Sequence, residues 1–287
     1  MTNNGFKYSF KVTGIERKQV ANIISEVIGQ EDSYDGAPKF SYRAGGWVID
    51  REGIVTTPET SIGDKEDIRS VFDALKAAGS IVADKGTVSF SLEGHTGNTL
   101  RNVVNLIWSK HSLLKKALDW HQDIVPASLV NAINAVPIAT LEDFAKVVND
   151  GIDAGKIVGE SDLDFDIADR TISYSFSNDS MDFDEVAAFI ALCWQINEQA
   201  KKQKFTSTKQ KEVENDKYAM RCFLLKLGFV GEAFKSERKV LLARLDGNAA
   251  FRTEEARLVA EEKRKQRSLD ANNLTLEQSK SEETENG

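Results

Sequence analysis

The stretch Phe6-Lys7-Tyr8-Ser9-Phe10-Lys11-Val12-Thr13 indicates how the fold begins. Apolar and polar side chains alternate along it, which is the period-two pattern of a strand that buries one of its faces. Gly14 breaks the pattern. Residues 15–28 then bring their apolar side chains onto one helical stripe, which Gly29 ends. The chain is therefore expected to start with a strand followed by a helix.

Two later stretches show the same alternation. Residues 87–92 and 171–177 place serine and threonine between apolar residues, and each predicts a half-buried strand. In the middle strand we expect Val88 and Phe90 to face the core and the serines beside them to face the opposite side. A register slip of one residue would exchange the two faces.

Helical periodicity fills most of the remaining chain. We expect helices at about residues 64–78, 96–120, 181–203, 216–228, 232–245 and 254–267, a helical region ending near residue 149, and a short hairpin over residues 47–56. Residues 150–170 predict a loop, and the segment after residue 268 predicts disorder because it is nearly without apolar residues. There is no βαβ regularity and no phosphate-binding glycine motif. The pattern predicts the α+β class, with a mostly antiparallel, curved sheet flanked by helices.

The composition is that of a folded chain with an acidic surface. Of 287 residues, 41% are hydrophobic and 29% are charged, which favours a packed core under a well-solvated surface. The 45 acidic residues outnumber the 37 basic ones, and the net charge of -8 repels polyphosphates. Broad nucleic-acid binding is therefore not expected, although a local basic strip is compatible with this charge.

The N-terminal residues predict neither export nor membrane insertion. They contain no apolar signal region, and no later segment approaches the roughly 20 apolar residues of a membrane span. Cys193 and Cys222 both lie in apolar helical patterns and predict reduced core thiols. We expect a cytoplasmic protein that does not enter a membrane.

The histidines do not predict a metal site. His95, His111 and His121 are separated by intervals that fit no metal-ligand spacing. His95, at the entry to a predicted helix, is interpreted as a capping or surface residue.

Three segments carry a resemblance to a known family. They are Val12-Thr13-Gly14-Ile15; Gly94-His95-Thr96 with Thr99-Leu100-Arg101-Asn102-Val103-Val104-Asn105 and Leu113-Leu114-Lys115-Lys116-Ala117-Leu118; and Asn215-Asp216-Lys217-Tyr218 with Asp246-Gly247-Asn248. In order and spacing, over roughly residues 6–252, the chain resembles the amidoligases often found on bacterial mobile elements. That family is related to the glutamine-synthetase-like carboxylate–amine ligases.

The resemblance implies a domain organisation. Residues 1–203 would form an amidoligase-like α+β domain with glutamine-synthetase-like catalytic-domain architecture. Residues 204–252 would form a helical C-terminal extension packed on that domain. Residues 253–287 would form a charged helix and a disordered tail.

The resemblance also implies a chemistry for which this chain lacks the usual residues. Such ligases phosphorylate a carboxylate with ATP and hold Mg²⁺ on acidic groups, and the family carries Glu-x-Glu, His-x-His and Glu-x-Arg on its three strands. Residues two apart on a strand share one face, so each pair points into the same cleft. The corresponding pairs here are Ser9 and Lys11, Ser89 and Ser91, and Ser173 and Ser175. Neutral hydroxyls bind Mg²⁺ weakly and a lysine ammonium repels it.

Other acids could form a relocated metal and ATP site. The candidates are Asp50, Glu52, Glu59 and Glu93, of which Glu52 can correspond to the acid that the family carries near its hairpin. Acids at turns and strand ends are usually solvated. The serines of the three strands are as compatible with an ordinary polar sheet face as with a binding groove.

Two charged segments complete the candidates for contact with partners. Residues 201–211 contain five lysines and Phe205, a composition that suits phosphate or an acidic partner and equally suits a solvated linker. The predicted helix 254–267 is charged nearly all round, which is typical of a solvated helix and compatible with docking on a partner.

Two hypotheses of function follow. The first is a non-catalytic protein on an amidoligase scaffold, carried by a phage or another mobile element, that binds a protein partner. Inhibition of a host defence complex would suit that origin, and no cofactor is expected. The second is an ATP- and Mg-dependent carboxylate–amine ligase with relocated metal ligands. The sequence leaves the partner, any substrate and homo-oligomerisation open.

Overall fold

The computed structural model describes residues 5–120, 123–177 and 182–285, with the side chains of 81–85, 177 and 270–285 left aside. His121, one of the histidines examined as metal ligands, lies outside the described residues. So does Met181, at which a helix was predicted to start. In chain order the elements are β1 (Gly5–Thr13), α1 (Arg17–Ile28), β2 (Asp32–Tyr34), β3 (Tyr42–Ala44), β4 (Trp47–Ile49), β5 (Ile54–Thr56), β6 (Thr60–Ser61), α2 (Glu66–Ala77), β7 (Ile81–Ser91), α3 (Gly97–Ser109), α4 (His111–Leu118), α5 (Ala127–Asn134), α6 (Leu141–Asp153), β8 (Leu163–Asp166), β9 (Thr171–Ser177), α7 (Phe183–Lys202), α8 (Asp216–Leu227), the 3-10 helix η1 (Glu232–Phe234), α9 (Lys235–Ala243) and α10 (Glu254–Glu285).

The strands form one open sheet. Its order is β2-β3-β4-β5-β1-β7-β9-β8, with β6 paired to β1 beside this path. Every pairing among the described strands is antiparallel. The predicted α+β class and the antiparallel sheet are therefore confirmed.

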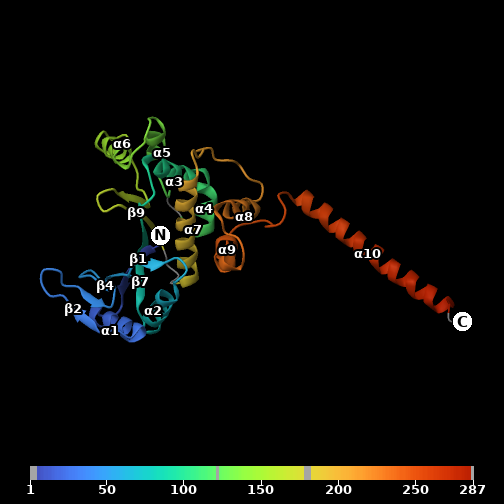
Figure 1. Ribbon diagram of the computed structural model, residues 1–287, viewed down its shortest axis with the longest axis horizontal. Helices are drawn as coiled ribbons and strands as arrows, with labels where there is room; N and C mark the ends of the chain where they lie inside the picture. The colour runs from blue at the N-terminus through green and yellow to red at the C-terminus, as the bar shows by residue number, and fades with distance from the viewer. Residues whose placement is uncertain (1–4, 121–122, 178–181, 286–287) are drawn as a thin grey trace.

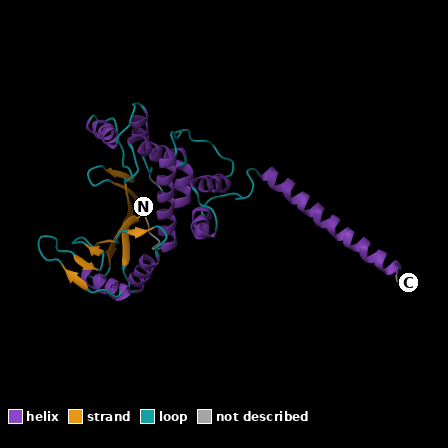
Figure 2. Ribbon diagram, viewed as in Figure 1, coloured by secondary structure: helices purple, strands orange, loops and turns teal. Residues whose placement is uncertain are grey.

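The core lies between one face of this sheet and the helices. Aromatic side chains of the central strands meet aromatic side chains of α2 and α7, with ring centroids 5.5 Å apart for Phe10 and Phe72 and 4.1 Å apart for Phe176 and Phe189. Figure 2 shows the helices gathered on this side of the strands. The alternation that begins the chain thus buries its aromatic half and leaves its polar half on the other side.

The middle strand is longer than predicted because it contains a bulge. The register between β1 and β7 shifts between Ser9 and Lys11, so β7 supplies extra residues opposite one stretch of β1. Gly86 lies at this point, and a β-carbon there would be 2.8 Å from Tyr8 Oη. The Asp84-Lys85-Gly86 sequence interrupts the alternation, which is why residues 81–86 were not predicted as strand.

Four short strands were missed and one helix is divided. β2, β3, β6 and β8 have two to four residues each, which is too short for periodicity to distinguish a strand from a loop such as the one predicted over 150–170. The predicted helix 96–120 breaks at Lys110, whose backbone angles of −121° and 13° are not helical. The two pieces, α3 and α4, continue the same apolar stripe in different directions.

The C-terminal part of the chain packs on the rest of the protein as far as α9. α9 contacts α7, α8 and α4, as a packed helical extension requires. Beyond it, α10 projects away from the rest of the chain (Figure 1). The disorder predicted past Ser268 is not found, because α10 runs on to Glu285: residues 254–285 contain neither glycine nor proline and are rich in good helix formers. Among the described residues, no helix combines the length and the apolar content needed to cross a bilayer.

Candidate functional site

The predicted strand pairs share the side of the sheet that faces away from the core. Tyr8, Val88 and Tyr174 are almost fully buried, whereas their neighbours along each strand are only partly buried. The register chosen for the middle strand is therefore confirmed. We call this side the open face; its residues are Lys7, Ser9, Lys11, Thr56, Thr87, Ser89, Ser91, Asp164, Asp166, Thr171, Ser173 and Ser175.

Hydroxyl groups form rows across the open face. Thr56, Ser9, Thr87 and Ser175 are successive partners on four neighbouring strands. The oxygen of Ser9 lies 3.0 Å from that of Thr56, and the oxygen of Thr87 lies 3.1 Å from that of Ser175. These cross-strand hydrogen bonds stabilise the sheet and satisfy the polar groups in pairs.

A second row runs beside the first and ends on charges. Lys7 is paired with Ser89, Ser89 with Ser173, and Ser173 with Asp164. The two serine oxygens lie 2.8 Å apart, which is the usual length of a hydrogen bond between hydroxyls. The row thus carries an ammonium at one end, a carboxylate at the other and neutral hydroxyls between them. Lys7, Thr56 and Thr87 were not singled out from the sequence, although Thr87 continues the alternation of Ser89 and was detectable.

Two of the candidate acids lie at the turn of the hairpin, and one of them has a structural role there. Oδ1 of Asp50 accepts hydrogen bonds from the backbone N–H groups of Glu52 and Ile54, each at 2.8 Å. This is the local turn that aspartate commonly forms with its own backbone. Glu52 is exposed and lies 3.6 Å from the guanidinium of Arg51. Neither acid belongs to a group of described side chains that could hold a metal ion.

The other two candidate acids do come together. Glu59 and Glu93 line one groove of about 360 Å³ at the end of the open face. Ser89, Ser91, Lys7, Asp169 and Arg170 line the same groove. Within residues 5–120, 123–177 and 182–285, however, no three acidic, histidine or cysteine side chains are grouped so that they could hold a metal ion. The relocated site built on all four acids is therefore not assembled.

The described histidines are core residues. His95 is buried, which contradicts its interpretation as a surface residue, and its Nδ1 lies 3.0 Å from Thr99 Oγ1. Burial, aided by the nearby Lys201 ammonium, lowers the pKa of His95 to about 3. His111 is also buried, and its Nε2 accepts the Ile124 N–H at 3.2 Å. Burial likewise lowers the pKa of His111.

The two cysteines differ in their surroundings. Cys193 is buried in α7 as predicted, and burial raises the pKa of its thiol. Cys222 is exposed on α8, so its prediction as a core thiol is wrong. Met220, Phe223, Leu224 and Leu227 form the buried side of α8, and the intervening positions face solvent.

The lysine-rich segment is not a free linker where it leaves α7. Three asparagines on one side of α3 donate hydrogen bonds to its backbone carbonyls: Asn102 to Gln203 at 2.7 Å, Asn98 to Lys204 at 3.0 Å and Asn105 to Thr206 at 3.0 Å. Asn102 and Asn105 are fully buried. We call residues 203–211 the strap. The asparagine spacing was visible in the sequence, but its partner segment lies about one hundred residues away.

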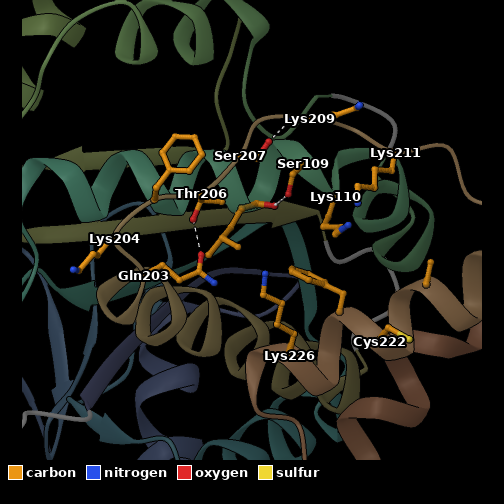
Figure 3. Close-up of a pocket in the computed structure, with 14 residues that line it drawn as sticks. Ser109, Lys110, Gln203, Lys204, Thr206, Ser207, Lys209, Lys211, Cys222 and Lys226 are labelled. Carbon is orange, nitrogen blue, oxygen red and sulfur yellow. Dashed lines mark hydrogen bonds between the residues drawn. The ribbon is translucent and has the colours of Figure 1, made fainter.

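The strap forms one wall of a groove. The end of α3, Lys110 at the junction of α3 with α4, and the exposed side of α8 complete it, enclosing about 850 Å³ (Figure 3). We call it the lysine groove; its lysines are Lys110, Lys204, Lys209, Lys211 and Lys226. The sequence could not associate Lys110 and Lys226 with the strap, because only the packing of α8 against α4 and α7 brings them together.

Comparison with protein-family models and with curated proteins identifies no relative of this chain. No protein-family model matches the sequence, and no curated protein matches it. The resemblance to amidoligases thus stands on the residues of this chain alone. The two parts of its third segment contact each other, since Nδ2 of Asn215 donates to the carbonyl oxygen of Asn248 at 2.8 Å, as it also does to that of Phe251.

Proposed function

We propose that this chain is a non-catalytic binding protein on an amidoligase-like scaffold and that it contacts a protein partner through the open face. The observation that carries the proposal is the pairing of hydroxyl with hydroxyl at the positions where a ligase places metal-binding groups. A phage or mobile-element origin and a partner in a host defence complex are the biological setting that the resemblance suggests.

The chemistry of the open face supports binding over phosphoryl transfer. Mg²⁺ bound with ATP requires carboxylate ligands to complete its octahedral shell. The central strands offer Ser9, Ser89 and Ser173 instead, with Lys11 on the same face as Ser9. Hydroxyls can donate and accept, so such a face can adapt to the polar groups of a partner surface without burying an unpaired charge.

Titration with Mg·ATP tests the absence of ligase chemistry. A ligand present at about 100 times its dissociation constant stabilises a protein by about 2.7 kcal/mol, which thermal unfolding detects readily. We expect the unfolding temperature to be the same with magnesium alone and with Mg·ATP. A clear magnesium-dependent increase on adding ATP would overturn the proposal.

Substitution on the open face tests the binding surface itself. Ser173→Arg and Ser89→Arg each place a long cation in the middle of the hydroxyl rows, so we expect both variants to lose the partners captured by the unaltered protein from its native host. Ser112→Arg, at an exposed position on α4, is the matched control. Equal partner capture by all three variants would exclude the open face as the contact surface.

One observation keeps the enzymatic hypothesis as a second candidate. Glu59 and Glu93 share a groove with two cationic side chains, Lys7 and Arg170. The two carboxylates are too few to form a metal site alone, but they could add ligands to an Mg²⁺ that ATP already carries while the cations contact its phosphates. If Mg·ATP does stabilise the protein, Glu93→Gln and Glu59→Gln should remove the stabilisation. Retention of the effect in both variants would exclude this groove as the ATP site.

A further inference from the structure

The lysine groove concentrates positive charge on an acidic protein. Five lysines line it, and none of its lining residues is acidic. Within the part of the chain that the structure describes, none of these five lysines forms an ion pair. In a chain whose acidic residues outnumber its basic ones 45 to 37, intramolecular partners are plentiful. Five unpaired cations around one groove therefore point to an anionic ligand from outside.

The groove is held in shape by buried contacts. Asn102 and Asn105 anchor the start of the strap on α3, and Thr206 of the strap is buried. Further along, Nε2 of Gln210 donates to the carbonyl oxygen of Trp108 at 3.0 Å. A ligand would thus meet a preformed wall and would lose less free energy in ordering it.

Lysines from different elements approach each other in the groove. Lys110 begins at the junction of α3 and α4, lies over the ring of Phe223 at 5.9 Å, and is half-buried. Burial lowers the pKa of Lys110, and the charges of Lys211 and Lys226 lower it further. Their repulsion would be relieved by an anion that lies between them.

The groove also has an apolar component. Leu106 and Phe223, which are almost fully buried, line it together with Phe205 of the strap, which is 72% exposed. The ring of Phe205 thus offers apolar surface beside the lysines. The ligand that fits is therefore anionic and carries at least one apolar group.

We propose that the lysine groove binds a short acidic peptide segment of a partner protein, with carboxylates on the lysines and an apolar side chain against Phe205. A peptide fits better than a nucleic acid for two reasons. Exposed Glu212 and Glu214 follow Lys211 directly and would repel a phosphate backbone that continued past the groove. Phe205 is also the only exposed aromatic side chain among the lining residues, whereas single-stranded nucleic acids use several stacking platforms.

This site lies beyond the proposed function, because it is built from other elements than the open face. The groove is formed by α3, α8, the strap and Lys110, and α7 packs both against α3 and, through Phe189, against Phe176 on the core side of the sheet. Substitutions in the groove should therefore leave contacts of the open face unchanged. The two proposals can fail independently.

Fluorescence anisotropy of a labelled peptide tests the groove. The probe is a fluorescein-labelled peptide of about twelve residues in which glutamates alternate with leucines, added to the full-length protein at low and at high salt. We expect saturable binding that weakens as salt screens the lysines. Lys209→Glu with Lys226→Glu, on opposite walls of the groove, should weaken binding by about tenfold or more, which is the range for loss of close charge pairs.

A matched variant separates the groove from the overall charge. Lys18→Glu with Lys156→Glu changes the net charge by the same amount at two exposed positions on other elements, and it should bind the peptide like the unaltered protein. Phe205→Ala should weaken binding of the leucine-containing peptide more than it weakens binding of a peptide made of glutamate and glycine. Equal loss in both charge variants, or no loss in the groove variant, would overturn the proposal.

The thiol of Cys222 allows a second measurement of peptide binding, at the groove itself. Its exposed thiol lines the groove, whereas the thiol of Cys193 is buried. Bound peptide should therefore slow modification of Cys222 by a maleimide. Protection of Cys222 by tripolyphosphate, with no protection by the peptide, would overturn the proposal in favour of a small anion.

A thymidine oligonucleotide of about 20 nucleotides tests the nucleic-acid alternative. Tighter binding of this oligonucleotide than of the peptide would overturn the proposal in favour of nucleic acid.

Discussion

His95 shows how one residue can have a local and a tertiary role together. Thr96 begins α3 with a reciprocal cap in which its side chain accepts from the backbone N–H of Thr99 and the hydroxyl of Thr99 accepts from the backbone N–H of Thr96. The hydroxyl of Thr99 also meets the ring of His95. The imidazole thus belongs to the start of the helix and to the core at once, and burial holds it in the neutral form.

The neutral state of His95 predicts a loss of stability in acid. Its pKa falls from an ordinary value of 6.5 to about 3 in the folded protein. Between these values the unfolded chain binds a proton that the folded chain does not, so the free energy of unfolding decreases as the pH falls through this window. One such proton corresponds to about 1.4 kcal/mol per pH unit. Denaturant unfolding between about pH 7 and pH 4 measures the slope.

The variant His95→Gln isolates this contribution. It should unfold with a smaller pH slope than the unaltered protein over the same range, while buried His111 continues to contribute. Should the variant fail to fold, the NMR titration of the His95 ring in the unaltered protein gives the same answer. A ring that titrates near pH 6.5 would contradict the prediction.

At the scale of elements, close backbone approach determines where α3 begins. The N–H of Gly97 donates to the carbonyl oxygen of Ala139 at 3.1 Å, which joins the first turn of α3 to the segment before α6. A β-carbon at Gly97 would lie 2.1 Å from the carbonyl oxygen of Thr140 and 2.4 Å from a methyl group of Ile138. Glycine is therefore required here by packing against backbone, which cannot move aside as a flexible side chain can.

The change Gly97→Ala should destabilise the protein although alanine favours helices. Overpacking of this kind costs about 1–3 kcal/mol, against a helix-propensity gain of about 1 kcal/mol or less. Gly63→Ala is the control, because no atom lies within 4 Å of a β-carbon placed there, and its effect should stay within about 0.5 kcal/mol. Denaturant unfolding of both variants decides; equal stability would show that α3 shifts to accept the methyl group.

At the scale of the whole molecule, the chain divides into a packed body and one projecting helix. Figure 1 shows α10 extending away from the body. Over residues 254–269, whose side chains the structure describes, Leu258, Val259 and Leu269 are its exposed large apolar residues, at 50%, 45% and 57%. Arg257 forms ion pairs with Glu254 and Glu261 along the same helix, and such exposed pairs stabilise a helix only weakly. The helix therefore contributes little to the body.

Deletion of residues 253–287 should leave the body intact. The cut falls after the segment whose carbonyl oxygens accept hydrogen bonds from Asn215, so those contacts remain. We expect the unfolding temperature to change by less than about 2 °C, since less than about 0.5 kcal/mol of stability is involved. A decrease of more than about 5 °C in a thermal melt would show that α10 packs on the body in solution.

The three alternating stretches were sufficient to predict the central strands β1, β7 and β9 and their polar face. Ser9, Ser89 and Ser173 were placed on one side because strand geometry alternates side chains whatever surrounds them. The short strands and the bulge at Gly86 escaped prediction, because two to four residues carry too little periodicity and a bulge breaks it. Among the candidate acids, Asp50 forms a local turn that its residue type favours. Glu59 and Glu93 line one groove only because the start of β6 and the end of β7 lie close together in the fold.

The sequence by itself determined the alternation of β1, β7 and β9, the helical stripes and the serines on the polar face of these strands, because these are properties of neighbouring residues. Only the tertiary structure decided that Asn98, Asn102 and Asn105 hold the strap, that His95 is buried, and that Lys110 and Lys226 face the lysines of the strap. Those features depend on contacts between segments far apart in the chain. Local periodicity carries no information about which distant segments approach one another.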